Sequence, residues 1–503
     1  MEVIIIITTI TLLLISFFFL KFITRRRNPT LPPGPFALPI IGNLLFIRKS
    51  FSQLEPILRN LHANYGPLVS LHLGSRRAVF IADRVLAHQA LVQNGAVFAD
   101  RPPALPTAKI FNSNQHSISS ARYGSTWRLL RRNISSEILH PSRVKCYSRA
   151  RKWVLDILLK RLELDSQNAA VLAHFQYAMF CLLVLMCFGV NNKIDETKIK
   201  EIENVQRRSL LTFSRFNILN VFPRLTKIVF RKRWEELLKL RQEQTQILLP
   251  LINSRNKVDD DDDDFVVCYV DTLLGLELGE EMRKLDSDEM VSLCSEFLNA
   301  GTDTTSTALQ WIMANLVKYP KIQHKIYDEI KGVVTAKTGV IEEEDLEKMS
   351  YLKGVILEGL RRHPPAHFVL PHAVSEDVVL GGHLVPKNGS VNFMVAEMGW
   401  DPKVWEDPME FKPERFINGD GSKVEFDVSG NREIKMMPFG VGRRICPAHA
   451  LAMLHLEYFV ANLVWKFEWN KVNDVDDVDL SEVQEFTVVM KNPLHACLTL
   501  RKH

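Results

Sequence analysis

The stretch that decides the interpretation of this chain is residues 439–448, Phe439-Gly440-Val441-Gly442-Arg443-Arg444-Ile445-Cys446-Pro447-Ala448. Glycines and a proline bracket one cysteine, and the apolar run at residues 450–464 predicts a helix just after it. A thiolate near a helix N-terminus is stabilised by the helix dipole and by free backbone amides, and Arg444 adds positive charge. The loop is therefore suited to hold an anionic sulfur at Cys446. A buried structural cysteine at a helix start is the competing interpretation, and on composition alone it is the commoner one.

A long central helix is predicted between Asp286 and Pro320. Asp286 and Glu289 resemble a capping box at its start, and apolar residues then recur at helical spacing at Met290, Leu293, Phe297, Ala308 and Ile312. Its middle reads Ala300-Gly301-Thr302-Asp303-Thr304-Thr305, although Gly costs about 1 kcal/mol relative to Ala inside a helix. Either the helix has a local kink, with threonines bonded back to the preceding turn, or Gly301 lets a ligand approach the backbone beside Asp303 and Thr304.

These two stretches resemble motifs of the cytochrome P-450 superfamily, whose haem-ligand loop has the pattern FxxGxRxC. Family motifs in the same order cover residues 300–448, and a weaker likeness extends from about Leu31 to the C-terminus. The resemblance implies a mainly α, multihelical cytochrome P-450 fold with small β-sheets. We expect β-like stretches near residues 68–73, 78–82, 369–384 and 494–500. One departure is Ala448, where the family usually has glycine; because alanine is small, close approach to the haem should survive.

The resemblance also assigns roles to individual residues. Cys446 is expected to be the thiolate ligand of the iron of haem b (iron protoporphyrin IX), and Thr304 and Asp303 are expected to deliver protons to dioxygen bound there. The other expected haem-binding residues are Gly301 and Phe439 and, for the two propionates, which need cationic or donor partners, Trp127, Arg131, His372 and Arg444. For Trp127 a plain core aromatic remains the alternative.

A further motif, Glu358-Gly359-Leu360-Arg361, is interpreted as structural. The i, i+3 spacing places Glu358 and Arg361 on one helix face, where they can pair. Such pairs are common and contribute little at a surface. In the family the pair is buried and joined by a later arginine, here Arg415, so we expect these three residues to hold the fold around the cysteine loop.

The N-terminus predicts a membrane anchor at residues 1–24. From Val3 to Leu20 the sequence carries no charge, which approaches the ~20 apolar residues of a spanning helix. A cleaved signal fits poorly because Glu2 precedes the run and no small-residue cleavage site follows it. The positive charges that follow favour a cytosolic position for the rest of the chain. Residues 25–39, basic and proline-rich, predict a stiff hinge, and residues 40–503 the haem-thiolate catalytic domain. The expected localisation is the endoplasmic reticulum membrane, single-pass, with the catalytic domain on the cytosolic face.

Composition bounds the remaining possibilities. The net charge of the 503 residues is +5, and no zinc-finger spacing or dense basic stripe appears, so nucleic-acid binding is not expected. The seven cysteines are scattered and form no CxxC pair, which argues against a disulfide framework. Six consecutive aspartates at residues 259–264 predict a solvated linker.

The expected function is a haem-thiolate monooxygenase that inserts one oxygen atom from dioxygen into a lipophilic small molecule, by hydroxylation or epoxidation. Within the family the sequence is most similar to plant microsomal A-type members, which act on specialised metabolites. No flavin or nucleotide fingerprint is present, so electrons are expected from an NADPH-cytochrome P-450 reductase, with cytochrome b5 as a second partner. The hypothetical basic docking patch consists of Arg128, Arg132, Lys435 and Arg443. By resemblance, substrate would contact residues 102–120, 210–221, 293–300, 366–370 and 486–490.

Two other classes stay open from the sequence. One is a reductase-independent haem-thiolate hydroperoxide isomerase or dehydratase, against which the presence of Asp303 and Thr304 argues. The other is a non-enzymatic haem sensor or carrier. Consumption of NADPH coupled to product formation would separate the three.

Overall fold

The structure, a computed structural model, describes Ser16 and residues 31–36, 51–73, 76–189, 196–220, 222–255, 266–279, 282–334, 340–422, 424–472 and 477–502. The predicted anchor (apart from Ser16), most of the predicted hinge and the aspartate run at residues 259–264 lie outside these residues. Contacts within the chain define two compact units, Met1–Pro102 with Phe368–Met394, and Pro103–His367 with Val395–His503. Each unit is described by itself.

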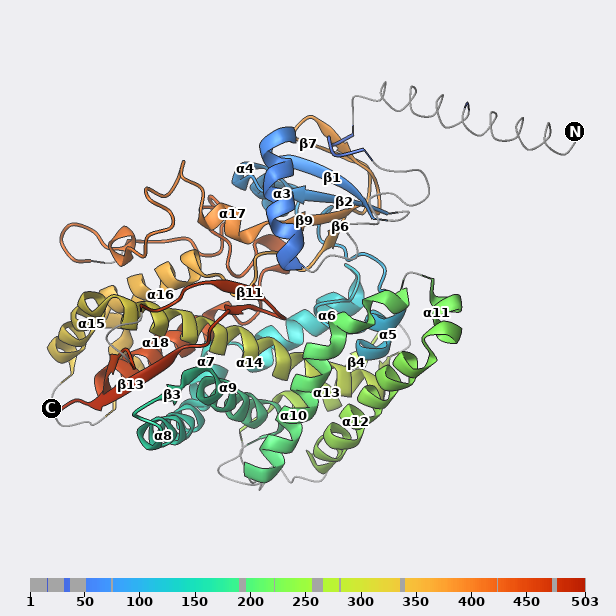
Figure 1. Ribbon diagram of the computed structural model, residues 1–503. Helices are drawn as coiled ribbons and strands as arrows, with labels where there is room; N and C mark the ends of the chain where they lie inside the picture. The colour runs from blue at the N-terminus through green and yellow to red at the C-terminus, as the bar shows by residue number, and fades with distance from the viewer. Residues whose placement is uncertain are drawn as a thin grey trace, which may run out of the picture. The chain divides into compact units, whose positions relative to one another are not determined.

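The first unit is built on a four-stranded sheet in the order β1-β2-β9-β6 (Figure 1). Its strands are β1 (Leu68–Leu73), β2 (Arg76–Ile81), β6 (His372–Ala373) and β9 (Ser390–Phe393), and β7 (Val378–Leu380) pairs with β8 (His383–Val385) in a separate hairpin. The helices are α3 (Phe51–Tyr65), α4 (Arg84–His88) and the π-helix η1 (Gln89–Gln93). Leu54 and Leu58 of α3 pack with Leu71, Phe80 and Met394 in one apolar cluster, which covers the sheet.

The second unit is mainly helical (Figure 1). Its helices up to residue 274 are α5 (Pro106–Phe111), η2 (Ser113–Gln115), α6 (Ser125–Asn133), η3 (Ile134–Ile138), α7 (Pro141–Cys146), α8 (Ser148–Leu164), α9 (Val171–Phe188), α10 (Glu196–Thr212), η4 (Phe213–Asn220), α11 (Pro223–Val229), α12 (Arg231–Arg255) and α13 (Tyr269–Leu274). The later helices are α14 (Ser287–Lys318), α15 (Pro320–Val333), η5 (Glu343–Lys348), α16 (Ser350–Arg362), α17 (Val395–Gly399), η6 (Pro413–Phe416), η7 (Gly442–Arg444) and α18 (His449–Lys466).

Small sheets complete this unit. A three-stranded sheet has the order β10-β13-β3, from β10 (Phe467–Asn470), β13 (His495–Leu500) and β3 (Ala169–Ala170). Two hairpins are β4 (Glu277–Leu278) with β5 (Arg283–Lys284), and β11 (Glu482–Gln484) with β12 (Val488–Met490). The predicted fold class, mainly α with small β-sheets, is therefore confirmed.

The central helix α14 is confirmed with its predicted cap. Asp286 accepts a hydrogen bond from the Glu289 amide at 2.8 Å, and Glu289 accepts one from the Asp286 amide at 2.9 Å. The five apolar positions predicted to face the core are all buried. Because α9, α10, α12, α16 and α18 all contact α14, its residues meet side chains from most of the unit (Figure 1).

Among the described residues, one helix is long and apolar enough to cross a membrane, and it is α9. Of its residues, 89% are buried inside the unit, where it packs against α8 and α14. Full burial of each of its large apolar side chains contributes about 1.5–3 kcal/mol. A helix that is apolar all round and covered by protein is a core helix.

Candidate active site

The cysteine loop is a tight turn that leads into α18. Gly440 and Gly442 have φ angles of 69° and 75°, which L side chains rarely adopt. The Cys446 amide donates a hydrogen bond to the Phe439 carbonyl at 2.8 Å and closes the loop. The predicted helix after the cysteine is confirmed as α18. The two glycines thus allow a backbone path that holds Cys446 three residues before the first residue of α18.

The electrostatic surroundings of Cys446 balance burial against nearby donors. Burial raises the pKa of the Cys446 thiol, whereas the backbone N–H of Ala448 and the positive charge of Arg131 act in the opposite direction. Ala448 has φ −95° and ψ 19°, outside the left-handed region, so alanine in place of the family's usual glycine introduces no backbone strain. The sulfur therefore has one amide donor and one cation in position to stabilise a negative charge.

Trp127 and Arg131 lie one turn apart on α6, as predicted, and they face the same side of that helix. Trp127 is buried and Arg131 is half-buried. Burial lowers the pKa of Arg131, and the proximity of Cys446 raises it. Among the described residues, neither the Arg131 guanidinium nor the Trp127 indole N–H has a hydrogen-bond acceptor. Donors without a protein acceptor near the half-buried Cys446 are suited to the carboxylates of an anionic ligand.

Arg444 is engaged by protein groups. Its guanidinium lies 4.4 Å from the centre of the Trp127 ring and donates hydrogen bonds to the carbonyls of Ala121 at 2.6 Å and Ile118 at 3.2 Å. It therefore ties the cysteine loop to the segment before α6. Its expected role toward a propionate stays a prediction.

His372 belongs to the first unit, where it lies in β6. Its Nδ1 donates a hydrogen bond to the Phe98 carbonyl at 2.7 Å, and its ring meets the Phe393 ring edge-on at 5.4 Å. These contacts fix the orientation of the imidazole within that unit. Its expected role at the haem also stays a prediction.

The hydroxyl groups in the middle of α14 bond back to the preceding turn. Thr302 donates to Leu298 at 2.7 Å, Thr304 donates to Ala300 at 2.6 Å, and Ser306 donates to Thr302 at 2.8 Å. This is the arrangement that the sequence left open as one of two alternatives. The Thr304 hydroxyl still has its lone pairs available to accept a proton or a hydrogen bond.

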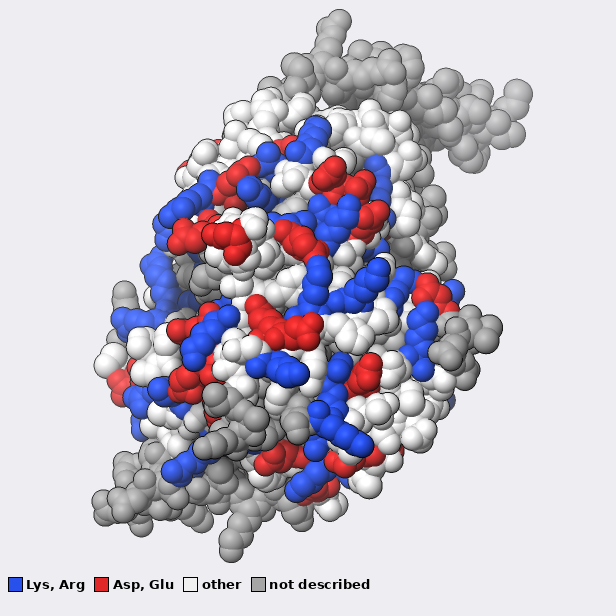
Figure 2. Space-filling model, turned by 90° about the vertical axis from the view of Figure 1, so that its left-hand side faces the viewer, with Lys and Arg blue, Asp and Glu red and all other residues white. Residues whose placement is uncertain are grey.

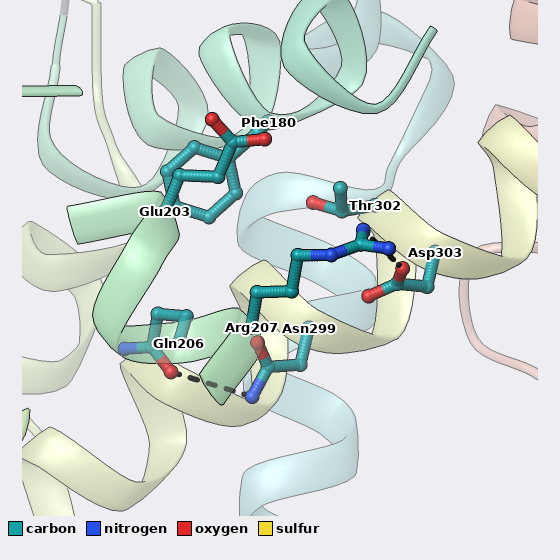
Figure 3. A pocket seen from close by; sticks show the side chains of 7 residues that line it. All are labelled: Phe180, Glu203, Gln206, Arg207, Asn299, Thr302 and Asp303. Carbon is teal, nitrogen blue, oxygen red and sulfur yellow. Dashed lines mark hydrogen bonds and ion pairs between the residues drawn. The ribbon is translucent and has the colours of Figure 1, made fainter. Parts of the chain in front are cut away.

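Asp303 points away from the helix toward α9 and α10 (Figure 3). Its Oδ1 accepts from Gln176 Nε2 at 3.3 Å and lies 3.4 Å from Arg207 Nη1. Burial raises the pKa of Asp303, and Arg207 and Gln176 partly offset this effect. The two partners are 127 and 96 residues away in the chain, and the sequence interpretation missed both. The i, i+4 spacing of Glu203 and Arg207 marks a charged helix face but does not identify Asp303 as its partner.

The absence of a side chain at Gly301 also serves helix packing, which the sequence did not predict. A Cβ at this position would lie 2.7 Å from Leu183 Cδ1 of α9, closer than carbon atoms can approach. The absent side chain therefore allows close contact between α9 and α14. The expected place of Gly301 beside the haem stays a prediction.

The predicted charged cluster around Glu358 is present and buried. Arg361 donates to both Glu358 oxygens, at 2.7 and 2.8 Å, and neither side chain has any exposed surface. Arg415 Nε lies 3.4 Å from Glu358 Oε1, and the Lys412 amide donates to the same oxygen at 2.7 Å. The cluster joins α16 to η6 and to the segment before it.

Two segments expected to contact substrate are attached to α14. Near its start, Glu296 accepts from the amides of Ile118 at 2.8 Å and Ser119 at 2.7 Å. One turn beyond its centre, Thr307 shares a hydrogen bond of 2.9 Å with Thr487, and the Trp311 indole N–H donates to the Val488 carbonyl at 2.8 Å. The structure thus anchors parts of residues 102–120 and 486–490 on the same helix as Asp303 and Thr304.

The predicted basic patch is partly assembled around Tyr123. The Arg443 guanidinium donates to the Tyr123 hydroxyl at 2.7 Å, and Arg128 lies 5.0 Å from the centre of the same ring. Arg128 and Arg132 also line a broad surface depression of about 980 Å³, solvent included, between α6 and the β4–β5 hairpin. Arg128, Arg132, Arg443 and Lys435 are all exposed.

Comparison with known proteins places these observations in a family. The sequence model of the family described as Cytochrome P450 matches residues 32–498. The protein named Cytochrome P450 89A9 of Arabidopsis thaliana is 53% identical over 487 residues, covering 94% of this chain and 94% of that protein. Isoflavone 2'-hydroxylase of Medicago truncatula is 31% identical over 488 residues, covering 95% and 93%. A zebra fish cytochrome P450 structure with progesterone has a TM-score of 0.75 at 22% identity, covering 89% of this chain and 99% of that chain, a likeness in fold.

Proposed function

The chain belongs to the cytochrome P450 family, and we propose that Cys446 ligates the iron of its haem and that the enzyme oxidises a lipophilic small molecule. It is a monooxygenase, and the cofactor of its family is a haem with a cysteine-ligated iron. The observation that carries the proposal is the closed cysteine loop, with the half-buried Cys446 near the guanidinium of Arg131, which has no acceptor among the described residues.

The residues around the loop fit a haem. Cys446 would hold the iron. Arg131 and Trp127 would donate hydrogen bonds to the propionates, because their N–H groups have no acceptor among the described residues. When bound, a thiolate-ligated haem activates dioxygen so that one oxygen atom can be inserted into a substrate. Phe439, His372 and Arg444 are further proposed haem neighbours.

We propose that Asp303 and Thr304 move the protons that the reaction consumes. Thr304 Oγ1 can accept a proton while its own hydrogen bonds to Ala300. Burial raises the pKa of the Asp303 carboxyl, so this group holds a proton more readily than an exposed aspartate does. Asp303 and Thr304 are consecutive on α14 and therefore point about 100° apart around the helix, so a water molecule would have to carry the proton between them.

The proposed substrate is a lipophilic plant-type metabolite. Leu293 and Phe297 are buried apolar residues of α14 itself. The hydrogen bonds of Thr307 and Trp311 hold the β12 segment against the same helix. One relative is named for isoflavone hydroxylation, and this supports aromatic or polycyclic candidates of similar size.

We further propose that an NADPH-cytochrome P-450 reductase, with cytochrome b5 as a second donor, docks on the basic patch formed by Arg128, Arg132, Lys435 and Arg443. Figure 2 shows the face that lies at the left-hand side of Figure 1, where acidic and basic side chains of the described residues are interspersed. A mixed face of this kind steers a charged partner weakly, whereas clustered arginines attract an acidic one. An N-terminal anchor at residues 1–24 would hold the enzyme at the endoplasmic reticulum membrane, beside such a reductase.

The decisive experiment is the spectrum of the purified, dithionite-reduced protein with carbon monoxide. The unmodified chain should give a thiolate-type spectrum, and Cys446→Ser should lose it together with all activity. Cys146→Ser is the matched control, because Cys146 is exposed and lies on α7. A histidine-type spectrum, or loss of the thiolate spectrum in both variants, would contradict the proposed ligation. Product formation without NADPH consumption would instead favour the hydroperoxide isomerase class.

A further inference from the structure

A small polar cavity lies on the side of α14 that faces α9 and α10 (Figure 3). Its volume is about 230 Å³, including the part open to solvent. Asp303, Arg207, Glu203 and Gln206 line it, together with Phe180, Asn299 and Thr302. Arg207 of α10 forms an ion pair with Asp303. The cavity therefore extends from the Asp303 carboxyl, the proposed proton carrier, to the surface of α10.

The cavity has three charged side chains, those of Asp303, Glu203 and Arg207, and Arg207 lowers the pKa of both carboxyl groups. Arg207 is 34% exposed at its side chain and Asp303 only 15%, so the pair extends from solvent into the unit. Glu203 lies one turn from Arg207 on α10. Burial and the negative charge of Asp303 raise the pKa of the Glu203 carboxyl, and the positive charges of Arg207, Arg161 and Lys200 lower it. Glu485, from the turn between β11 and β12, acts on Asp303 in the same sense as burial. The cavity therefore holds two carboxyl groups with one shared cation.

Gln206, which lines this cavity, has one donor without an acceptor among the described residues. The side-chain oxygen of Gln206 accepts from Gln244 at 3.1 Å, Ser295 at 2.8 Å and Asn299 at 3.3 Å. Its Nε2 is buried and donates to no described protein group. Buried N–H groups of this kind are usually satisfied by ordered water. About 10 Å³ of the cavity is open to the centre of a water molecule, which is room for about one.

We infer that this cavity is the route by which Asp303 is reprotonated from solvent, with Glu203 as the carboxyl that takes up the proton and Arg207 as the cation that positions both. The inference rests on the proposed role of Asp303. Glu203 carboxylate takes a proton from bulk water and becomes a carboxylic acid. It then passes that proton to a cavity water, which protonates the Asp303 carboxylate, and Glu203 returns to its charged form. No electron moves in these steps, and each proton that Asp303 gives up is replaced by one from solvent.

The first test compares Glu203→Gln with Glu201→Gln in the reductase-reconstituted, haem-loaded full chain. Glu201 is the matched control because it lies on the same helix, outside the cavity, in an exposed pair with Lys198. Glu203→Gln should slow turnover about tenfold and raise the solvent deuterium isotope effect, while Glu201→Gln leaves both unchanged. Glu203→Asp should restore most of the rate. For the cation, Arg207→Met should shift the pH profile to higher pH and Arg207→Lys should not, with Arg208→Met as the control on the adjacent exposed arginine.

A second readout does not depend on turnover. Because the pKa of Glu203 is raised on folding, its contribution to stability is present at low pH and is lost as pH rises through its folded pKa. The difference in melting temperature between the unmodified chain and Glu203→Gln should therefore change with pH. In the Asp303→Asn background this change should occur at lower pH, since the Asp303 charge no longer acts on Glu203.

The outcomes separate the two claims. If Asp303→Asn slows turnover but Glu203→Gln behaves like Glu201→Gln in rate, isotope effect and pH profile, the route through Glu203 is wrong and the role of Asp303 stands. If Asp303→Asn itself has no effect on rate or isotope effect, the proposed role of Asp303 fails, and with it this inference. A purely structural role of the pair would lower the melting temperature and leave the isotope effect unchanged.

Discussion

Replacing Arg361 by methionine should destabilise the protein because it leaves a buried charge and several carbonyls without their donor. Besides its two bonds to Glu358, Arg361 donates to the carbonyls of Gly399 and Pro408, each at 2.7 Å, and of Glu410 at 3.1 Å. Methionine keeps much of the side-chain volume and removes every donor. The variant therefore isolates the loss of charge and hydrogen bonds from the opening of a cavity.

The expected magnitude follows from burial. Removing one partner of a fully buried ion pair typically costs about 3–5 kcal/mol. At about 2.1 cal/mol/K per residue, the 503 residues have an unfolding entropy of roughly 1.1 kcal/mol/K, so this loss lowers the melting temperature by about 3–5 °C. Arg415 and the Lys412 amide still face Glu358, which favours the lower end of that range.

The assay is thermal unfolding of the haem-loaded full chain, followed by circular dichroism at one heating rate, since haem proteins seldom unfold in two states. Arg231→Met is the matched control, because Arg231 pairs with Glu235 at 2.8 Å while 81% of its side chain is exposed. An exposed pair contributes about 0–1 kcal/mol, so the control should move by no more than about 1 °C. If Arg361→Met moved no further than Arg231→Met, the cluster would not hold this region of the fold as argued.

Three further predictions concern other parts of the molecule. Thr304→Ala should retain haem, change the unfolding free energy by no more than about 0.5 kcal/mol, and release several-fold more hydrogen peroxide per NADPH; tight coupling would argue against its role in proton delivery. Burial opposes ionisation of Glu289, but hydrogen bonds from Arg283, the Asp286 amide and His116 outweigh this effect and lower the Glu289 pKa to about 2. Glu289→Gln should therefore reduce the free energy of unfolding by about 1–3 kcal/mol above pH 5, and by progressively less as the pH falls toward 2. Denaturation measured at each pH tests this. Arg128→Ser should slow electron transfer from the reductase roughly two- to fivefold at low salt and much less at high salt; equal rates at both salt concentrations would exclude the basic patch as the docking face.

Local patterns were sufficient to predict much of the fold. The cap at Asp286 and the apolar periodicity after it lie within one helix, and both are confirmed in α14. The stretch at residues 68–73 is confirmed as β1, and that at residues 494–500 as β13, His495–Leu500. In the region of residues 369–384 the structure has short strands interrupted by a turn at Gly381 and Gly382, both with positive φ. Such features depend on neighbours a few residues apart, and a single sequence contains that information.

The amino-acid sequence by itself determined the family, the cysteine loop and the central helix, because each depends on residue types at fixed short spacings. Only the tertiary structure decided that Asp303 faces Gln176 and Arg207, that Gly301 accommodates Leu183, and that Arg444 binds two carbonyls before α6. Those partners lie about 100 to more than 300 residues away in the chain, and no local propensity specifies them. They meet because α9 and α10 pack against α14, which buries apolar faces across the unit, and because Arg444 of the cysteine loop lies over the Trp127 ring of α6.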